Sequence, residues 1–233
     1  MKTIFLVDAD DTILDFHGVS ARALRSAFEE SGIAWEERFA VEYKKINEKL
    51  WEALEKKQLT RLELMDKRFH FVLSHLGIEN VDGTEFNKKY LQYIATKPVY
   101  FDGAQDFLIK LNQMGSVYVV TNGTAWIQDS RFEIARLLDY VKCAFISERV
   151  GYDKPDALYT QFIAEHIPDF ATEKAVWIGD SLSADIKAAN DAGITAVWYN
   201  RHHKQLSGEY YPDFISDNFE EILNFIQRIN QDN

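Results

Sequence analysis

The stretch FLVDADDTILDF, residues 5–16, joins an apolar run directly to a cluster of acidic side chains. The apolar run Ile4–Val7 has the length of a short strand, and Asp8, Asp10 and Asp11 follow it at once. Carboxylates this close repel one another, and they are costly beside a hydrophobic core unless a positive charge compensates them. The stretch therefore predicts a buried strand that ends in a site for a cation or another positively charged group.

Further apolar runs of strand length follow later in the chain, and they do not alternate with polar residues. Such runs are typical of strands that are buried on both faces of a parallel sheet. They are residues 117–121, 143–147, 175–178 and 196–199. Helical patterns separate them at residues 104–114, 126–138, 156–166, 183–192 and 219–229. Strands that alternate with helices through short connections predict the α/β class, with a Rossmann-like doubly wound parallel sheet.

The alternation stops after the first strand, where a long segment shows helical periodicity alone. Its expected helices are residues 22–30, 42–54, 62–76 and 86–94. Thr60 and Glu63 have the spacing of a capping box, in which each side chain accepts a hydrogen bond from the other residue's free backbone N–H. We therefore predict an α/β core domain of residues 1–15 and 100–233, interrupted by an all-helical domain of residues 16–99.

Charge and composition limit the classes of partner. A formal net charge of −11 argues against binding to a nucleic-acid polymer, but a small phosphorylated substrate remains compatible with it. The first apolar run breaks at Asp8, which fits neither a signal peptide nor a membrane span, so no membrane partner is expected. The single cysteine, Cys143, cannot pair within the chain and is interpreted as a structural thiol. A cytoplasmic protein, monomeric or homodimeric, is expected.

Polar clusters follow several of the predicted strands, and ligands of open α/β sheets bind beyond the carboxyl ends of the strands. The clusters are DADDT at residues 8–12, TNGT at 121–124, KP at 154–155 and GDSLSAD at 179–185. Each cluster alone is compatible with a turn or a helix cap. As an ordered set on successive strands, they predict one shared site.

The residue types in these clusters suit phosphoryl transfer. The carboxylates of Asp8, Asp10 and Asp180 are oxygen ligands of the kind that Mg²⁺ prefers. Thr121 and Asn122 offer hydroxyl, amide and backbone donors to phosphate oxygens, and Lys154 offers a compact positive charge. Stabilising the charge on those oxygens is the main task of a phosphoryl-transfer site.

The ordered motifs resemble those of the haloacid dehalogenase superfamily, whose phosphatases carry DxDxT, then a Ser or Thr, a Lys and an acidic GD motif. The resemblance covers essentially the whole chain, and the helical domain is similar to the cap domain of that superfamily. It implies that Asp8 is a nucleophile that forms an aspartyl-phosphate, and that Asp10 is the general acid and base with its backbone carbonyl on the metal. The remaining implied roles are a hydrogen bond from Thr121 to the phosphoryl group, Lys154 neutralising that group and holding Asp8, Asp180 completing the Mg²⁺ site, and Asp185 with Ser181 supporting the metal through water.

Several stretches resemble one branch of this superfamily, the house-cleaning nucleoside 5'-monophosphate phosphatases that prefer pyrimidine nucleotides. They include DDTILDF at residues 10–16, the TNG turn with the helix that carries Gln128 and Arg131, and WYNR at 198–201. The resemblance implies a 5'-nucleotidase. A nucleobase needs an aromatic or apolar surface to stack on, and the candidates are Phe16, Trp126, Tyr43 and Trp51.

Other functions remain open on the sequence. A sugar-phosphate phosphatase or phosphomutase would use the same core chemistry with a different cap. A haloacid dehalogenase would need Asp8 but neither Mg²⁺ nor an acid at position 10, so Asp10 weighs against it. A phosphate-binding module without turnover would not require the complete set of acidic, Thr and Lys residues.

Overall fold

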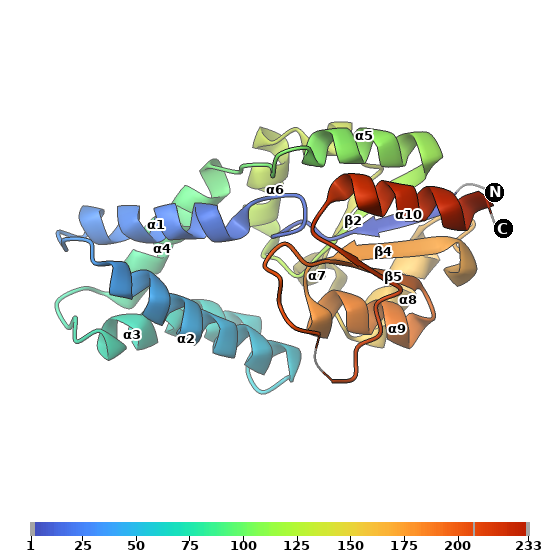
Figure 1. Cartoon of the computed structure of the whole chain (residues 1–233). Helices are drawn as coiled ribbons and strands as arrows, with labels where there is room; N and C mark the ends of the chain where they lie inside the picture. Colours follow the sequence, from blue (N-terminus) through green and yellow to red (C-terminus); the bar gives the residue numbers. More distant parts are fainter. Residues whose placement is uncertain (1–2, 207, 232–233) are drawn as a thin grey trace. The chain divides into compact units, whose positions relative to one another are not determined.

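The computed structural model describes residues 3–206 and 208–231, and the chain divides into two compact units. The first unit contains the residues up to Phe16 and those from Pro98 onward, and the second is His17–Lys97. Figure 1 shows the helices and strands of both units along the chain. Among the described residues, every helix is too short or too polar to cross a bilayer.

The first unit is built on a six-stranded sheet in which every neighbouring pair of strands is parallel. This confirms the predicted α/β class and the doubly wound sheet. The strand order is β3-β2-β1-β4-β5-β6. The strands are β1 (Thr3–Val7), β2 (Gly115–Thr121), β3 (Ala144–Ile146), β4 (Ala175–Gly179), β5 (Thr195–Tyr199) and β6 (Phe214–Ser216).

Strand β6 was not predicted, because it has only three residues and no apolar run that stands out from its surroundings. It pairs with β5 along its length, and Asp213, directly before β6, adds two further hydrogen bonds to β5. The backbone N–H of Asp213 donates to the carbonyl of Ala196 at 2.8 Å, and the Asp213 carboxylate accepts from the Ala196 N–H at 2.7 Å. The sheet is thus extended by a tertiary contact that the local sequence does not signal.

Helices cover both faces of the sheet, and this explains the unbroken apolar runs. Successive residues of a strand point to opposite faces, so Phe5 packs on one side and Leu6 on the other. The helices on the first side include α5 (Ala104–Met114) and α10 (Phe219–Gln231), and those on the second include α8 (Ala157–His166) and α9 (Lys187–Ala192) (Figure 1). Each fully buried Leu, Val or Phe contributes about 1.5–3 kcal/mol, so these two layers hold the sheet in place.

Some predicted boundaries in this unit are wrong. Helix α6 (Ala125–Ile134) ends before the predicted residue 138, because Arg136 adopts a left-handed conformation with φ of 52° and a 3₁₀ turn, η1 (Leu137–Asp139), follows. The predicted helix 183–192 begins instead with a π-helical turn, η3 (Leu182–Ile186), before α9. Neither change has a Gly or Pro signal at the residue where it occurs.

The predicted strand 143–147 is also shorter than expected. Strand β3 begins after Cys143, and its last predicted residue, Ser147, already opens the short helix α7 (Ser147–Val150). The side chain of Cys143 is exposed rather than packed in the core, so its interpretation as a structural thiol is wrong. The backbone carbonyl of Cys143 accepts a hydrogen bond from the N–H of Val119 at 3.0 Å.

The second unit is entirely helical, and its helices are longer than the periodicity predicted except α3, which has the predicted length and begins one residue earlier. They are α1 (Phe16–Glu30), α2 (Glu37–Glu55), α3 (Arg61–His75) and α4 (Gly83–Thr96). Aromatic rings fill the centre, where Phe86 packs 4.7 Å from Phe28 and 4.8 Å from Phe69 between ring centroids. This aromatic core gives the unit an interior of its own.

The predicted capping box at the start of α3 is confirmed. The Thr60 hydroxyl accepts from the Glu63 N–H at 3.2 Å, and the Glu63 carboxylate accepts from the Thr60 N–H at 3.0 Å. Both backbone donors would otherwise lack an intrahelical partner. The box therefore sets the residue at which α3 begins.

Replacing Thr60 by Ala should destabilise the first turn of α3 by about 1 kcal/mol, because the side-chain acceptor is lost. Hydrogen exchange of the amides at the start of α3 measures this local effect. Thr60→Ser is the matched control, since it keeps the hydroxyl and should stay within about 0.5 kcal/mol of the parent. Equal exchange in both variants would contradict the capping role.

Candidate active site

The first unit brings the polar clusters together at the point where the strand order changes direction. Strand β1 pairs with β2 on one side and with β4 on the other. Asp8 follows the last residue of β1, Thr121 is the last residue of β2, and Asp180 follows β4. A crevice at the carboxyl ends of strands beside such a switch point is the usual ligand site of this class of sheet.

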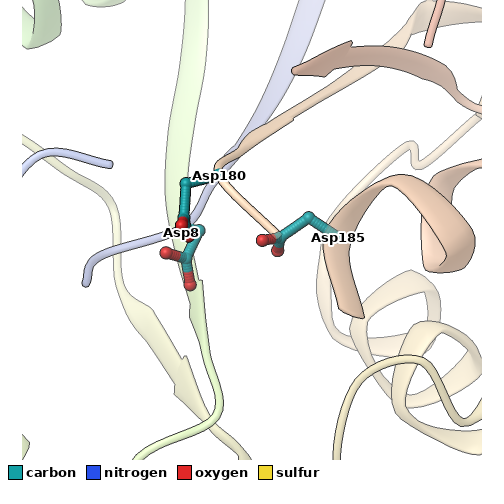
Figure 2. A group of neighbouring side chains, drawn as sticks. All are labelled: Asp8, Asp180 and Asp185. Carbon is teal, nitrogen blue, oxygen red and sulfur yellow. The ribbon is translucent and has the colours of Figure 1, made fainter. Parts of the chain in front are cut away.

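The carboxylates of Asp8, Asp180 and Asp185 converge there (Figure 2). One oxygen of each lies within 4.8 Å of the others. Burial, followed by the nearby carboxylates of Asp11 and Asp185, raises the pKa of Asp180 to about 7. Burial also raises the pKa of Asp8 above its ordinary value.

The donor set fits a hard divalent cation such as Mg²⁺. Its ligand atoms are carboxylate oxygens, and burial together with the neighbouring carboxylates raises the pKa values of Asp8 and Asp180. The cationic partner of Asp180, the ammonium of Lys204, is half-exposed and lies 3.8 Å away. A bound cation would therefore relieve the repulsion that the sequence predicted.

Lys154 provides the buried positive charge beside the acidic cluster. Its ammonium donates to Asp8 Oδ1 at 2.6 Å, to Asp185 Oδ1 at 2.7 Å and to the carbonyl of Val120 at 3.0 Å. Burial by itself lowers the pKa of Lys154, but the carboxylates of Asp185 and Asp8 more than offset this, so the pKa rises above its ordinary value. Lys154 therefore stays protonated and holds both carboxylates in place.

The side chain of Asn122 positions Lys154 through its backbone. The Asn122 amide accepts from the Lys154 N–H at 2.8 Å and donates to the Lys154 carbonyl at 2.8 Å. The peptide bond that follows, between Lys154 and Pro155, is cis. A phosphate contact by Asn122 stays a prediction, and its backbone N–H is the group suited to it because the side-chain amide is already engaged.

Asp185 is held by several donors besides Lys154. It accepts from the indole N–H of Trp177 at 3.1 Å and from the backbone N–H of Ser181 at 3.2 Å. A Cβ at Gly179 would lie 2.2 Å from the Asp185 carboxyl carbon, so glycine is needed at position 179 to leave room for this side chain. The hydroxyl of Ser181 accepts from the Ala184 N–H at 3.2 Å and caps η3, so the contact of Ser181 with Asp185 is made by its backbone.

The turn after β1 separates the side chains of Asp8 and Asp10. Asp11 has a left-handed φ of 60°, which Asp tolerates better than most residues. The N–H of Leu14 donates to the carbonyl of Ala9 at 2.8 Å and so closes the turn. The Thr12 hydroxyl donates to Asp8 Oδ2 at 3.1 Å. Both oxygens of Asp8 thus have a donor.

The carboxylate of Asp10 contacts residues of helix α6. Arg131 Nη2 lies 2.6 Å from Asp10 Oδ1, and Gln128 Nε2 donates to Asp10 Oδ2 at 2.9 Å. Gln128 Nε2 also donates to the Thr121 hydroxyl at 3.0 Å. The side chain of Asp10 is therefore not part of the acidic cluster, and its metal contact through the backbone carbonyl stays a prediction.

Some contacts of the site were not predicted from the residues. The roles of Trp177 and of the Asn122 side chain have no signal in the sequence, because they depend on which strands become neighbours. Thr12 could have been found, since it stands in the DxDxT motif. Gln128 and Arg131 were noticed only through the resemblance, without a role.

The candidate aromatic surfaces differ in accessibility. Trp126 on α6 is 49% exposed, and the ring of Phe16 lies 5.7 Å from the Arg131 guanidinium. Both stay candidates. In the helical unit, Trp51 is half-buried beside Arg61, whereas Tyr43 is buried and its hydroxyl lies 2.5 Å from that of Tyr90. Tyr43 is thus a residue of the helical core rather than a surface for a base.

Comparison with known proteins shows similarity along almost the whole chain. The model of the haloacid dehalogenase-like hydrolase family matches residues 2–193. The pyrimidine 5'-nucleotidase PynA of Streptococcus pneumoniae is 35% identical over 224 residues, which are 96% of this chain and 94% of PynA. The pyrimidine 5'-nucleotidase YjjG of Escherichia coli is 26% identical over 198 residues, which are 85% of this chain and 86% of YjjG. A crystal structure of the HAD-hydrolase YfnB of Bacillus subtilis, bound to magnesium, superposes with a TM-score of 0.91 at 36% identity and covers 97% of this chain and 98% of YfnB.

Magnesium should stabilise the protein more at pH 8 than at pH 6. In the metal-free protein the folded state keeps the proton of Asp180 up to a pKa of about 7, whereas an unfolded Asp loses its proton near its ordinary value of 3.8. The folded state therefore binds more protons between these values, and this group's contribution to stability falls as the pH rises through that window. A cation that binds the ionised cluster reverses the loss.

The measurement is the increase in Tm on adding MgCl₂ at each pH, with Asp180→Asn as the control. The pH dependence of that increase should be smaller in the control, because position 180 no longer titrates. A Tm increase that is the same at pH 6 and pH 8 in the parent would contradict a cation at Asp180.

Proposed function

The chain belongs to the haloacid dehalogenase-like hydrolase family, and from this we propose that it is a magnesium-dependent phosphomonoesterase that acts through an aspartyl-phosphate on nucleoside 5'-monophosphates. The observation that carries the proposal is the buried ammonium of Lys154, which lies 2.6 Å from Asp8 and 2.7 Å from Asp185 at the carboxyl end of the sheet. It holds a carboxylate nucleophile beside a cluster of cation ligands.

Asp8 is the proposed nucleophile. One of its carboxylate oxygens bonds to the phosphorus atom of the substrate while the bond from phosphorus to the ester oxygen breaks. Lys154 and the Thr12 hydroxyl hold the Asp8 carboxylate, which restricts its rotation before the attack. The Thr121 hydroxyl donates to a phosphoryl oxygen, whose charge grows during the transfer.

Asp10 is the proposed general acid and base. It gives a proton to the departing ester oxygen, so the leaving group departs as an alcohol. It then takes a proton from a water molecule, whose oxygen attacks the phosphorus of the aspartyl-phosphate and releases inorganic phosphate with Asp8 restored. The side chain of Asp10 is partly exposed, at 26%, whereas Asp8 and Asp185 are buried. Its Oδ1 is buried against Arg131, so Oδ2 is the oxygen that we propose to exchange the proton.

Asp8, Asp180 and the backbone carbonyl of Asp10 would hold Mg²⁺, with Asp185 and Ser181 supporting it through water. When bound, the ion supplies positive charge to the phosphoryl oxygens and to the acidic cluster. The carboxylate geometry of the cluster supports this assignment, as does the magnesium in the similar YfnB structure.

Pyrimidine nucleoside 5'-monophosphates are the proposed substrate class within the phosphate esters. The names of PynA and YjjG support the class, because both are pyrimidine 5'-nucleotidases with similarity over most of this chain. The half-exposed indole of Trp126, two residues after the TNGT cluster, offers a ring on which a base could stack.

Asp8→Asn should lower kcat by more than about 10³-fold, because an amide cannot replace the carboxylate as nucleophile. Asp10→Asn should lower kcat by about 10²–10⁴-fold, the usual contribution of a general acid or base. Release of inorganic phosphate from uridine 5'-monophosphate with MgCl₂ measures both. Near-parental turnover in Asp8→Asn would overturn the assignment of the nucleophile.

The substrate class is tested by comparing kcat/KM for pyrimidine and purine nucleoside 5'-monophosphates, hexose phosphates and small phospho-acids. We expect the pyrimidine nucleotides to give the highest values. Preference for a hexose phosphate over every nucleotide would instead support a sugar-phosphate phosphatase with the same core chemistry. A protein that binds phosphate but releases none from any ester would refute the enzyme assignment.

A further inference from the structure

Two buried polar side chains of helix α6 reach the candidate site without a role in the chemistry described above. Gln128 and Arg131 are each 1% exposed, and they stand three residues apart, so they lie on one face of the helix. Burying an arginine and a glutamine is costly unless their polar groups are paired. Their partners are Asp10, Thr121 and one another.

Arg131 determines which way the Gln128 amide points. Arg131 Nη1 donates at 2.6 Å to the Gln128 side-chain oxygen. A guanidinium has only donors, so the atom of Gln128 that faces it must be the oxygen and not the nitrogen. The amide NH₂ of Gln128 is thereby turned toward the other side, where Asp10 and Thr121 lie.

The Gln128 NH₂ group, in turn, determines the direction of the Thr121 hydrogen bond. It donates at 2.9 Å to Asp10 and at 3.0 Å to the Thr121 hydroxyl. A hydroxyl has one proton, and when its oxygen accepts from Gln128 that proton points elsewhere. The Thr121 O–H is then available to donate to a phosphoryl oxygen, which can only accept.

Arg131 and Gln128 also hold Asp10 by both of its oxygens. Arg131 Nη2 lies 2.6 Å from Oδ1 in an ion pair, although the angle is not that of an aligned hydrogen bond, and Gln128 donates to Oδ2. Two contacts of this kind fix the rotation of a carboxylate more tightly than one. The orientation of the Asp10 carboxylate is thus fixed by groups that do not touch the substrate.

Gly123 supports the same conclusion independently. A Cβ at this position would lie 2.6 Å from Cγ and 2.7 Å from Nε2 of Gln128, closer than real Cβ contacts allow. Its φ is not in the left-handed region, so the backbone conformation does not demand glycine. The glycine of the TNGT cluster is therefore explained by the space that Gln128 occupies.

We propose that Arg131 and Gln128 are positioning residues, which orient the Thr121 hydroxyl as a donor to the phosphoryl group and fix the carboxylate of Asp10 toward the leaving oxygen. This inference rests on the proposed phosphatase function. Arg131 and Gln128 would then help to position the reacting groups both for the transfer to Asp8 and for hydrolysis of the aspartyl-phosphate. Gly123 would belong to the site because it leaves room for Gln128.

The test is Gln128→Glu, which keeps the shape of the side chain and an acceptor for Arg131 but removes the NH₂ donor. We expect kcat/KM, which reports the transfer to Asp8 and not the later hydrolysis step shared by all substrates, to fall by about 10²-fold or more on uridine 5'-monophosphate, as when a single preorganised donor is removed from an oxyanion site. On p-nitrophenyl phosphate, whose leaving group needs no proton from Asp10, the loss should be at least about tenfold smaller. A role in folding alone would lower both rates equally, together with Tm.

Gly123→Ala provides a second variant in which Gln128 is kept but displaced. Like Gln128→Glu, it should lower the hydrolysis of uridine 5'-monophosphate more than that of p-nitrophenyl phosphate. Arg131→Lys retains a donor and a charge and should recover part of the activity that Arg131→Met loses. Gln161→Glu is the matched control, because Gln161 is exposed on α8 and contacts Glu165, and it should leave both rates at the parental level.

An unchanged rate ratio in folded Gln128→Glu and Gly123→Ala, with an active parent, would overturn the positioning role and leave the phosphatase assignment intact. A parent that hydrolyses neither ester would overturn the proposed function and this inference together. Circular dichroism and Tm of each variant show whether it is folded.

Discussion

The contact between the Lys154 ammonium and the carboxylates of Asp8 and Asp185 is the constraint on which the site depends. The ammonium and both carboxylates are almost completely removed from water, and a buried charge is tolerated only when its partners are fixed. The three residues come from distant parts of the chain. Their pairing therefore requires that β1 and β4 be neighbours and that the segment after β3 return to the same end of the sheet.

Much of the surrounding structure serves to keep these groups in place. Asn122 holds the Lys154 backbone, Trp177 and Ser181 hold Asp185, and Gly179 leaves the space that Asp185 fills. None of these groups needs to contact a substrate. Because these groups are already in place, little rearrangement of the site is needed during a reaction. This explains why small and polar residues lie so close to a hydrophobic core.

One fold can host different reactions, so the fold alone does not determine the chemistry. In this chain the carboxylate of Asp10 lies beside Arg131 and Gln128, and a separate acidic cluster lies beside Lys154. Two carboxylates two residues apart thus have different surroundings, which is the physical basis for giving them different roles.

The amino-acid sequence by itself determined the α/β class, the doubly wound sheet and the capping box of α3, because apolar runs, helical periodicity and cap spacing are local patterns. It also placed Asp8, Thr121, Lys154 and Asp180 at the ends of strands, where a shared site was expected. Only the tertiary structure decided the short strand β6, the early end of α6 at Arg136 and the exposure of Cys143. It alone also decided which donors surround each carboxylate. The physical reason is that hydrogen-bond partners such as Trp177 with Asp185, or Gln128 with Thr121, depend on which elements become neighbours in space, and no local pattern records that choice.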